Sequence, residues 1–267
     1  MAGVNQNKNG GNMKITFLGT GANGGVPQLD CLCTNCVAAA RDANLIRRRS
    51  SFLVETKGKR ILIECGPDVW SQLQSMNLKT TDLDLVVVSH LHFDHANGLP
   101  ELSGGNNGEI PVLMSGSNLT KFMNSDMAFL VDRNFVTLVD EKFGQKCGVK
   151  LFDIPHDPIF PTSGILIADG EKKIWISTDV ENITEEMKKV MSKSNLVVFD
   201  STFFDESVFP ASKLHHMTVE RSLPILRKLN TRVVFSHINH SENWQRVEEL
   251  VNKAGCKLAC DGMMLSV

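Results

Sequence analysis

The sequence contains the run Ser-His-Leu-His-Phe-Asp-His directly after a continuous apolar segment, Leu85–Val88. An apolar segment of this length is typical of a buried β-strand, so the run is expected on the loop at a strand end. His90 and His92 are separated by one residue, and in an extended backbone both imidazoles point to the same side. Asp94 and His95 follow on the turn and can face a second position. Because imidazole and carboxylate ligands together suit zinc, manganese or iron, the run predicts a metal site.

A histidine-rich surface loop that binds no metal is the alternative interpretation of this run. Each of the other histidines follows a predicted strand or lies in a predicted loop, whereas a random scatter would place some on helix faces. These residues are His156, His215, His216, His237 and His240. Their placement favours a metal-binding set that extends beyond the central run.

The remaining pattern predicts an α/β fold. Short apolar or alternating runs predict strands at Lys14–Leu18, Ser51–Glu55, Ile61–Cys65, Leu85–Val88, Pro111–Met114, Phe135–Val139, Lys150–Ile154, Gly164–Ala168, Ile174–Ser177, Leu196–Phe199 and Arg232–Phe235. Fewer helices are expected, at Glu185–Ser192, Val219–Leu229 and Trp244–Ala254. Strands with interspersed helices but no regular βαβ alternation predict two sheets covered by helices.

Length and composition favour one large domain. The chain has 267 residues, of which 42% are hydrophobic, and this is enough for a single sizeable core. Residues 13–267 are expected to form this domain, and the polar residues 1–12 a disordered tail. No stretch approaches the roughly 20 apolar residues of a membrane span, and the start lacks the apolar core of a secretory signal, so a cytoplasmic protein is expected.

The charge balance argues against a broad nucleic-acid surface. The formal net charge is −2, and Arg47-Arg48-Arg49 is the only compact basic run. We interpret this run as a solvated turn, with a phosphate clamp as the functional alternative. A nucleic-acid partner is therefore not expected.

A second metal site is predicted from the cysteines. Cys31, Cys33 and Cys36 form a C-x-C-x-x-C cluster, and in a reduced compartment such a cluster indicates zinc more often than disulfides. Tetrahedral zinc needs a fourth ligand, for which His240 is the candidate. Four protein ligands leave no open position, so this zinc would be structural. A redox dithiol is the alternative. Four more cysteines, expected in or near the core, are Cys65, Cys147, Cys256 and Cys260.

The His-x-His-x-Asp-His run resembles the signature of the metallo-β-lactamase superfamily, and the similarity extends from about Lys14 to the C-terminus. The resemblance implies an αββα sandwich of two mixed β-sheets flanked by helices. It also implies two catalytic divalent metals, Zn²⁺ or Mn²⁺. The implied ligands of the first metal are His90, His92 and His156, those of the second are Asp94, His95 and His237, and Asp179 is the bridging carboxylate.

The sequence departs from the superfamily pattern at one position. Ile63-Glu64-Cys65-Gly66 stands where relatives commonly have Asp before the small residue and Gly. Glu64 is expected to support the ligands in place of that aspartate, with a longer side chain.

Within the superfamily the chain is similar to two families, the cyclic phosphodiesterases of the carbon–phosphorus lyase pathway and pyrroloquinoline quinone biosynthesis protein B. The cysteine cluster, the Ser236–His240 segment and Asp261-Gly262-Met263 fit both. The Gly24–Gln28 segment favours the quinone protein, whereas the complete histidine run and Leu214–Val219 favour the phosphodiesterase.

The resemblance therefore implies a binuclear hydrolase acting on a small, cyclic or linear, phosphodiester. Asp94 is expected to orient the water nucleophile, and His216 to protonate the leaving group, with His215 as the alternative acid. An enzyme or carrier resembling the quinone protein is the second hypothesis. A redox enzyme is disfavoured because di-iron relatives have Glu at the position of His92. The oligomeric state is open, although homodimers are common among such proteins.

Overall fold

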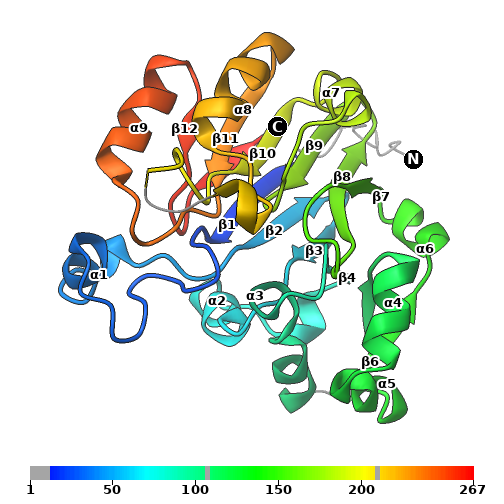
Figure 1. Cartoon of the computed structure of the whole chain (residues 1–267). Coiled ribbons are helices and arrows are strands. Elements are labelled where there is room, and N and C mark those ends of the chain that lie inside the picture. Colours follow the sequence, from blue (N-terminus) through cyan, green and yellow to red (C-terminus); the bar gives the residue numbers. More distant parts are fainter. Residues whose placement is uncertain (1–12, 106–108, 208–210) are drawn as a thin grey trace, which may run out of the picture.

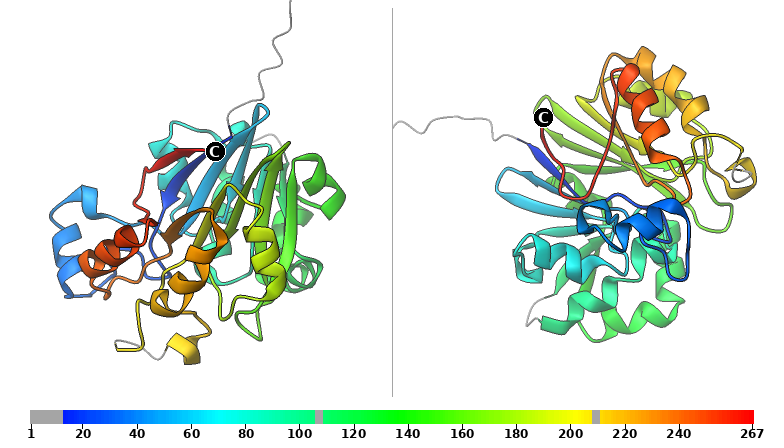
Figure 2. Two further views of the ribbon diagram at one scale, coloured as in Figure 1. Left: turned by 90° about the horizontal axis from the view of Figure 1, so that it is seen from above. Right: turned by 90° about the vertical axis from the view of Figure 1, so that its left-hand side faces the viewer.

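The computed structural model describes residues 13–105, 109–207 and 211–267. Two β-sheets lie face to face, and helices cover the outer side of each, as Figures 1 and 2 show. This arrangement is the αββα sandwich of the metallo-β-lactamase fold, which confirms the expected fold class. The tail expected at residues 1–12 lies outside the described residues.

The first sheet has the strand order β13-β1-β2-β3-β4-β5-β6. Its strands are β1 Lys14–Gly19, β2 Ser51–Thr56, β3 Lys59–Ile63, β4 Leu85–Val87, β5 Ile110–Leu113, β6 Val136–Val139 and β13 Met264–Ser266. The β13 to β3 half is antiparallel, and β3 to β6 run parallel.

The second sheet has the order β12-β11-β10-β9-β8-β7. Its strands are β7 Val149–Ile154, β8 Thr162–Asp169, β9 Lys172–Ser177, β10 Leu196–Asp200, β11 Arg232–Ser236 and β12 Lys257–Leu258. Strands β9 to β12 are parallel, whereas β7, β8 and β9 pair antiparallel. Every strand predicted from the sequence is present, and β12 and β13 were missed because they are too short to show a pattern.

The largest hydrophobic cluster fills the space between the sheets. Phe17 and Phe52 from the first sheet and Ile167, Ile176 and Val198 from the second are buried in it. Two further clusters lie on the outer faces, beneath the helices. Burial on both faces explains why these strands read as continuous apolar runs rather than as alternating ones.

The helices are more numerous than the sequence predicted. The expected ones are present as α7 Glu185–Met191, α8 Val219–Leu226 and α9 Trp244–Lys253. The missed helices are α1 Thr34–Ala39, α2 Val69–Ser75, α3 Phe93–Ala96, α4 Gly116–Met123, α5 Phe129–Asp132 and α6 Glu141–Lys146. Each spans at most about two turns, which is too short for a helical period to stand out. None of the helices in the described parts of the chain combines the length and apolar character that a bilayer crossing requires.

Strand direction decides where a site can form. Strands β9, β10 and β11 are parallel, and β7 runs the same way because it is two antiparallel steps from β9. Their C-terminal ends therefore meet at one edge of the second sheet. The C-terminal end of β4, in the first sheet, faces the same region (Figure 1).

Candidate metal centre

The side chains of the predicted ligand set converge at this edge, and they form two groups. Within each group, one potential ligand atom per residue lies within 4.8 Å of every other. The first group is His90, His92, His156 and Asp179, and the second is Asp94, His95 and His237. The structure thus brings together all seven residues that the resemblance implied, with Asp179 grouped with the ligands of the first metal.

The two groups meet at Asp179, at the end of β9. Its Oδ1 lies 3.6 Å from His156 Nε2, and its Oδ2 lies 3.2 Å from His95 Nε2. In the second group, Asp94 Oδ2 lies 3.2 Å from His95 Nε2 and 3.5 Å from His237 Nε2. Asp179 therefore lies between the two groups, and the resemblance implied a bridging carboxylate at this residue.

Hydrogen bonds on the side that faces away from the centre fix the orientation of two imidazoles, those of His156 and His237. His156 Nδ1 donates to the carbonyl of His215 over 2.9 Å. His237 Nδ1 lies 2.6 Å from Thr202 Oγ1, and this hydroxyl donates to Asp200. In both histidines the proton is thus held on Nδ1, and the lone pair of Nε2 faces the centre. Such outer contacts set the tautomer and the direction of a metal ligand.

Glu64 supports His95 in a similar way. Its Oε2 accepts a hydrogen bond from the backbone of Ser89 over 3.2 Å and lies 3.4 Å from His95 Nδ1. Gly66, two residues after Glu64, passes very close to the motif. A Cβ atom at this position would lie 1.9 Å from the carbonyl oxygen of Asp94. Only glycine permits this approach, so the Glu64–Gly66 segment and the motif are packed as one unit.

Unsatisfied buried atoms test whether the centre suits a cation. His95 Nε2, His156 Nε2 and Asp179 Oδ2 are buried and lack a hydrogen-bond partner in the structure. Buried polar atoms are rarely left without partners in folded proteins. Nitrogen lone pairs and carboxylate oxygens that point at one another are an arrangement that a divalent cation stabilises, so the residues fit such a group.

The charge states of three residues fit the same conclusion, whereas the Asp94 carboxylate outweighs burial and raises the pKa of His95 well above its ordinary value. Burial lowers the pKa of His90 well below its ordinary value, and it also lowers the pKa of His156. Both imidazoles are therefore neutral and can offer a lone pair to a metal. Burial alone would raise the pKa of Asp179, but the surrounding histidines hold it well below the ordinary value. Neutral imidazoles and ionised carboxylates are the forms that bind metals.

His216 and Asp200 form a pair beside the metal ligands. His216 Nδ1 lies 2.7 Å from Asp200 Oδ2, and His216 Nε2 lies 3.9 Å from Asp179 Oδ1. Burial alone would lower the pKa of His216, but the Asp200 carboxylate outweighs it and raises the pKa. Asp200 and Thr202 were not predicted from the sequence. A signal for Asp200 was available, because it ends a parallel strand, close to where other site residues follow theirs.

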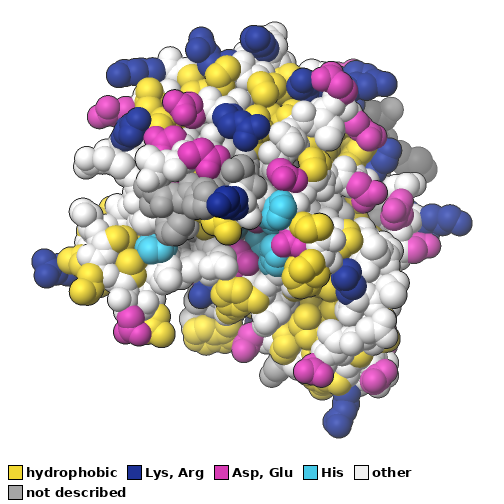
Figure 3. Space-filling model, viewed as in Figure 1, with side chains coloured by type: hydrophobic (Ala, Val, Ile, Leu, Met, Phe, Trp, Pro, Cys, Tyr) yellow, Lys and Arg dark blue, Asp and Glu magenta, His cyan; other side chains and the backbone are white. Residues whose placement is uncertain are grey.

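A cavity of about 510 Å³ opens over the ligands. Figure 3 shows histidine side chains gathered in a hollow near the middle of the molecular face. Besides metal-ligand candidates, the residues that line the cavity include Asn23, Asp157, Phe203, Lys213, His215, His216 and Asn239. A small polar molecule therefore has direct access to the centre.

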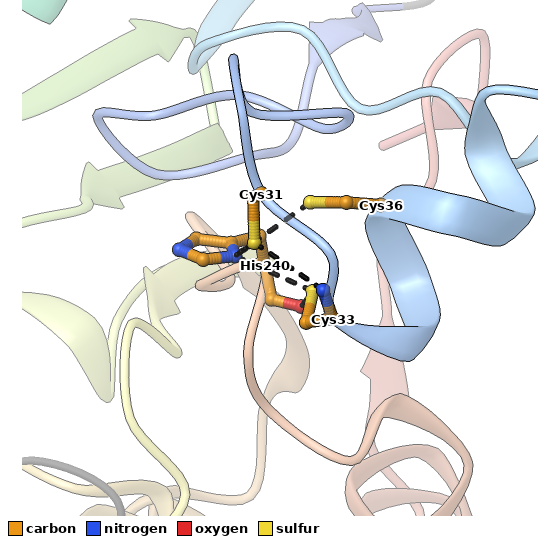
Figure 4. Close-up of side chains that lie close together, drawn as sticks. All are labelled: Cys31, Cys33, Cys36 and His240. Atoms are coloured by element: carbon orange, nitrogen blue, oxygen red, sulfur yellow. Dashed lines mark hydrogen bonds between the residues drawn. The ribbon is translucent and has the colours of Figure 1, made fainter.

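The predicted cysteine cluster is also assembled. Figure 4 shows Cys31, Cys33, Cys36 and His240 pointing toward one another. The three Sγ atoms lie 3.3, 3.5 and 3.6 Å from His240 Nδ1. Tetrahedral zinc with Zn–S near 2.3 Å and Zn–N near 2.0 Å would separate sulfur and nitrogen by about 3.5 Å. Burial raises the pKa of Cys36 to about 12, so a cation is needed to hold it as thiolate at neutral pH.

The cysteine cluster is tied to the loop that carries His237. Asn35 Nδ2 donates to the carbonyl oxygens of His240 and Glu242 over 2.8 and 2.7 Å. On the other side, the backbones of Ala22 and Ile238 are hydrogen-bonded over 3.0 Å. The segment after β11 is thus held by the cysteine loop at one end and contributes His237 to the centre at the other.

Two expectations from the sequence need correction. Arg47, Arg48 and Arg49 are not a solvated turn, because Arg47 donates to Thr20 and Ala259 and the other two pair with Asp261 and Asp68. These contacts also occupy the guanidinium groups that a phosphate clamp would need. Cys260 is exposed rather than near the core, whereas Cys65, Cys147 and Cys256 are buried as expected.

Comparisons with known proteins agree with the fold and the motif. Residues 59–238 match the model of the β-lactamase superfamily domain. An octanoyltransferase of Porphyromonas gingivalis is 41% identical to this chain over 85% of the chain's length. The matched region covers only 46% of that relative. Zn²⁺-bound PqqB from Methylobacterium extorquens superposes with a TM-score of 0.78 at 21% identity, covering 95% of this chain and all of that one. A diphosphatase of the PhnP family superposes with a TM-score of 0.77 at 22% identity, covering 96% and 98%. The chain therefore belongs to the β-lactamase superfamily and has the metallo-β-lactamase fold of its metal-dependent hydrolases.

Proposed function

We propose that this protein is a binuclear metal-dependent phosphodiesterase that hydrolyses a small phosphodiester. The observation that supports it most is the convergence of two metal-ligand groups and the His216–Asp200 pair on one cavity. Metal ligands alone occur in many proteins. A histidine held by a buried carboxylate beside them adds the proton donor that ester hydrolysis needs.

The proposal includes three cations. His90, His92, His156 and Asp179 would hold one, and Asp94, His95 and His237, with Asp179 shared, the second. We assign Zn²⁺ or Mn²⁺ to these positions and a structural Zn²⁺ to the cysteine cluster. Paired divalent metals supply a nucleophile at neutral pH by lowering the pKa of water, and they offset charge on phosphoryl oxygens.

The chain's own residues act around the phosphorus. Asp94 would orient the attacking water as well as bind metal. His216 would donate a proton from Nε2 to the leaving alkoxide, while Asp200 holds its Nδ1 and stabilises the imidazolium. We prefer His216 to His215 because His216 Nε2 lies 3.9 Å from Asp179 and its carboxylate partner Asp200 is buried, whereas the partner of His215, Glu181, is partly exposed.

The substrate is proposed to be a small anion. A cavity of about 510 Å³ accommodates a compact diester, as ligand pockets of about 300–1,000 Å³ hold small molecules. Among the described residues, Lys213 is the only lysine or arginine that lines this cavity. We propose a small molecule rather than a nucleic acid, with a homodimer as the state to test. We also place the protein in the cytoplasm, where the free cysteines stay reduced.

Lys213→Ala is expected to raise KM for a phosphodiester about fivefold while kcat changes little, because an exposed ammonium contributes modest attraction to a bound anion. Steady-state kinetics at several salt concentrations would measure this, since the difference should shrink as salt screens the charge. Lys213→Arg is the control and should retain a KM near that of the wild type. An unchanged KM in the alanine variant at low salt would contradict the assignment.

A substrate screen tests the proposed function. The purified protein, loaded with Zn²⁺ or Mn²⁺, is offered bis-aryl, cyclic nucleotide and cyclic ribose phosphodiesters. An octanoyl thioester and a lactone are included because the Porphyromonas gingivalis relative is an octanoyltransferase. Turnover of phosphodiesters alone supports the proposal, whereas turnover of only thioesters or lactones overturns it. Turnover of nothing would favour the second candidate, an enzyme or carrier resembling PqqB, whose fold the chain shares.

A further inference from the structure

His92 differs from the other histidines of the first group, His90 and His156, in its surroundings. His90 Nε2 and His92 Nδ1 lie 2.8 Å apart, so these two nitrogens face one point. In three other candidate ligands, the ring nitrogen that faces away from the centre lies beside a neutral hydroxyl or carbonyl oxygen. These are His90, His156 and His237. His92 Nε2 instead lies 3.6 Å from Asp157 Oδ2, at the partly exposed mouth of the cavity. A carboxylate behind a ligand imidazole has a stronger effect on its basicity than a neutral oxygen.

Asp157 is held in place to face His92. Its Oδ1 accepts hydrogen bonds from the backbones of Ile159 and Phe160 over 2.6 and 3.1 Å. This leaves Oδ2 as the oxygen directed at His92. The ring of Phe160 packs edge-on against His92 with centroids 4.8 Å apart. A single loop therefore contributes the ligand His156 and also restrains the His92 ring from outside.

We infer that Asp157 is a positioning residue that tunes His92 as a metal ligand. When a cation takes the lone pair of Nδ1, the ring proton must reside on Nε2, where Asp157 is the facing acceptor. The present 3.6 Å separation is longer than an N–H···O bond of about 2.9 Å, and we expect it to shorten when a cation is bound. The inference rests on the proposed metal centre but not on the identity of the substrate.

The test is the metal affinity of Asp157→Asn, measured by competition with a chelating dye and by the visible spectrum after loading with Co²⁺. The amide keeps an oxygen for the backbone contacts and removes the charge. Loss of such an outer partner typically costs 10–100-fold in affinity. We expect about this loss for one active-site cation, a shifted Co²⁺ spectrum, and an unchanged cysteine site. Asp153→Asn is the matched control, because it removes an exposed carboxylate near the end of β7, just before the loop that carries Asp157.

A comparison in the His92→Ala background separates positioning from general charge loss. Asp157→Asn should have no further effect on affinity there, because its partner is gone. Wild-type affinity in Asp157→Asn, an equal loss in Asp153→Asn, or an undiminished effect in His92→Ala would each overturn the inference. A wild-type protein that binds two cations but hydrolyses no phosphodiester would instead overturn the proposed function and leave this inference standing.

Discussion

His216→Ala should retain its full metal content and lose about 10²–10⁴-fold in kcat on an alkyl phosphodiester, as expected for removal of a general acid. The reason is that an alkoxide is a poor leaving group unless it is protonated as it departs. His216 is oriented for this by Asp200 and lies outside both ligand groups. Steady-state kinetics and metal analysis by mass spectrometry on the same samples would measure both quantities.

The leaving group provides a sharper version of the same experiment. A p-nitrophenyl ester needs little proton donation, so the loss in His216→Ala should be much smaller with it than with an alkyl ester. His215→Ala is the neighbouring control and should have the lesser effect, because its backbone carbonyl to His156 is retained. Loss of metal from His216→Ala would make it a ligand. A larger loss in His215→Ala would reassign the acid.

Cys33→Ser should lose the structural zinc and lower the melting temperature by roughly 8–16 °C, which corresponds to about 4 kcal/mol of unfolding free energy for a chain of this size. Its Sγ lies 3.5 Å from His240 Nδ1, and also contacts the His240 carbonyl. Without the zinc, the loop of α1 no longer restrains the segment that carries His237. Active-site metal content should therefore fall as well, although that site is not mutated.

Differential scanning calorimetry and metal analysis would measure the effects of Cys33→Ser. Cys260→Ser is a matched control, since it makes the same atomic change at an exposed cysteine outside the cluster. It should leave both metal sites and the melting temperature nearly unchanged. Full occupancy of the active site in Cys33→Ser would show that the two sites are independent.

Local patterns were enough to predict most of the strands and part of the site. Strands buried on both faces appear as apolar runs, and the four ligand-type side chains of the central run lie within six residues of one another. The short helices were not predictable, because about two turns give no clear period and their stability comes from packing on the sheets. The arginine run was misread since its acceptors, Asp68 and Asp261, are distant in sequence.

The sequence by itself determined the types of ligand and the strand ends on which they lie, because these follow from spacing and apolar runs, and the superfamily resemblance implied their division between two groups. Only the tertiary structure decided which polar residues contact the ligands and the neighbouring His216. Asp200 reaches His216 across 16 residues, and Asp157, on the loop after β7 of the second sheet, faces His92, which follows β4 of the first. These partners are single polar residues without a local pattern, and they become recognisable only when strand packing brings the chain segments together.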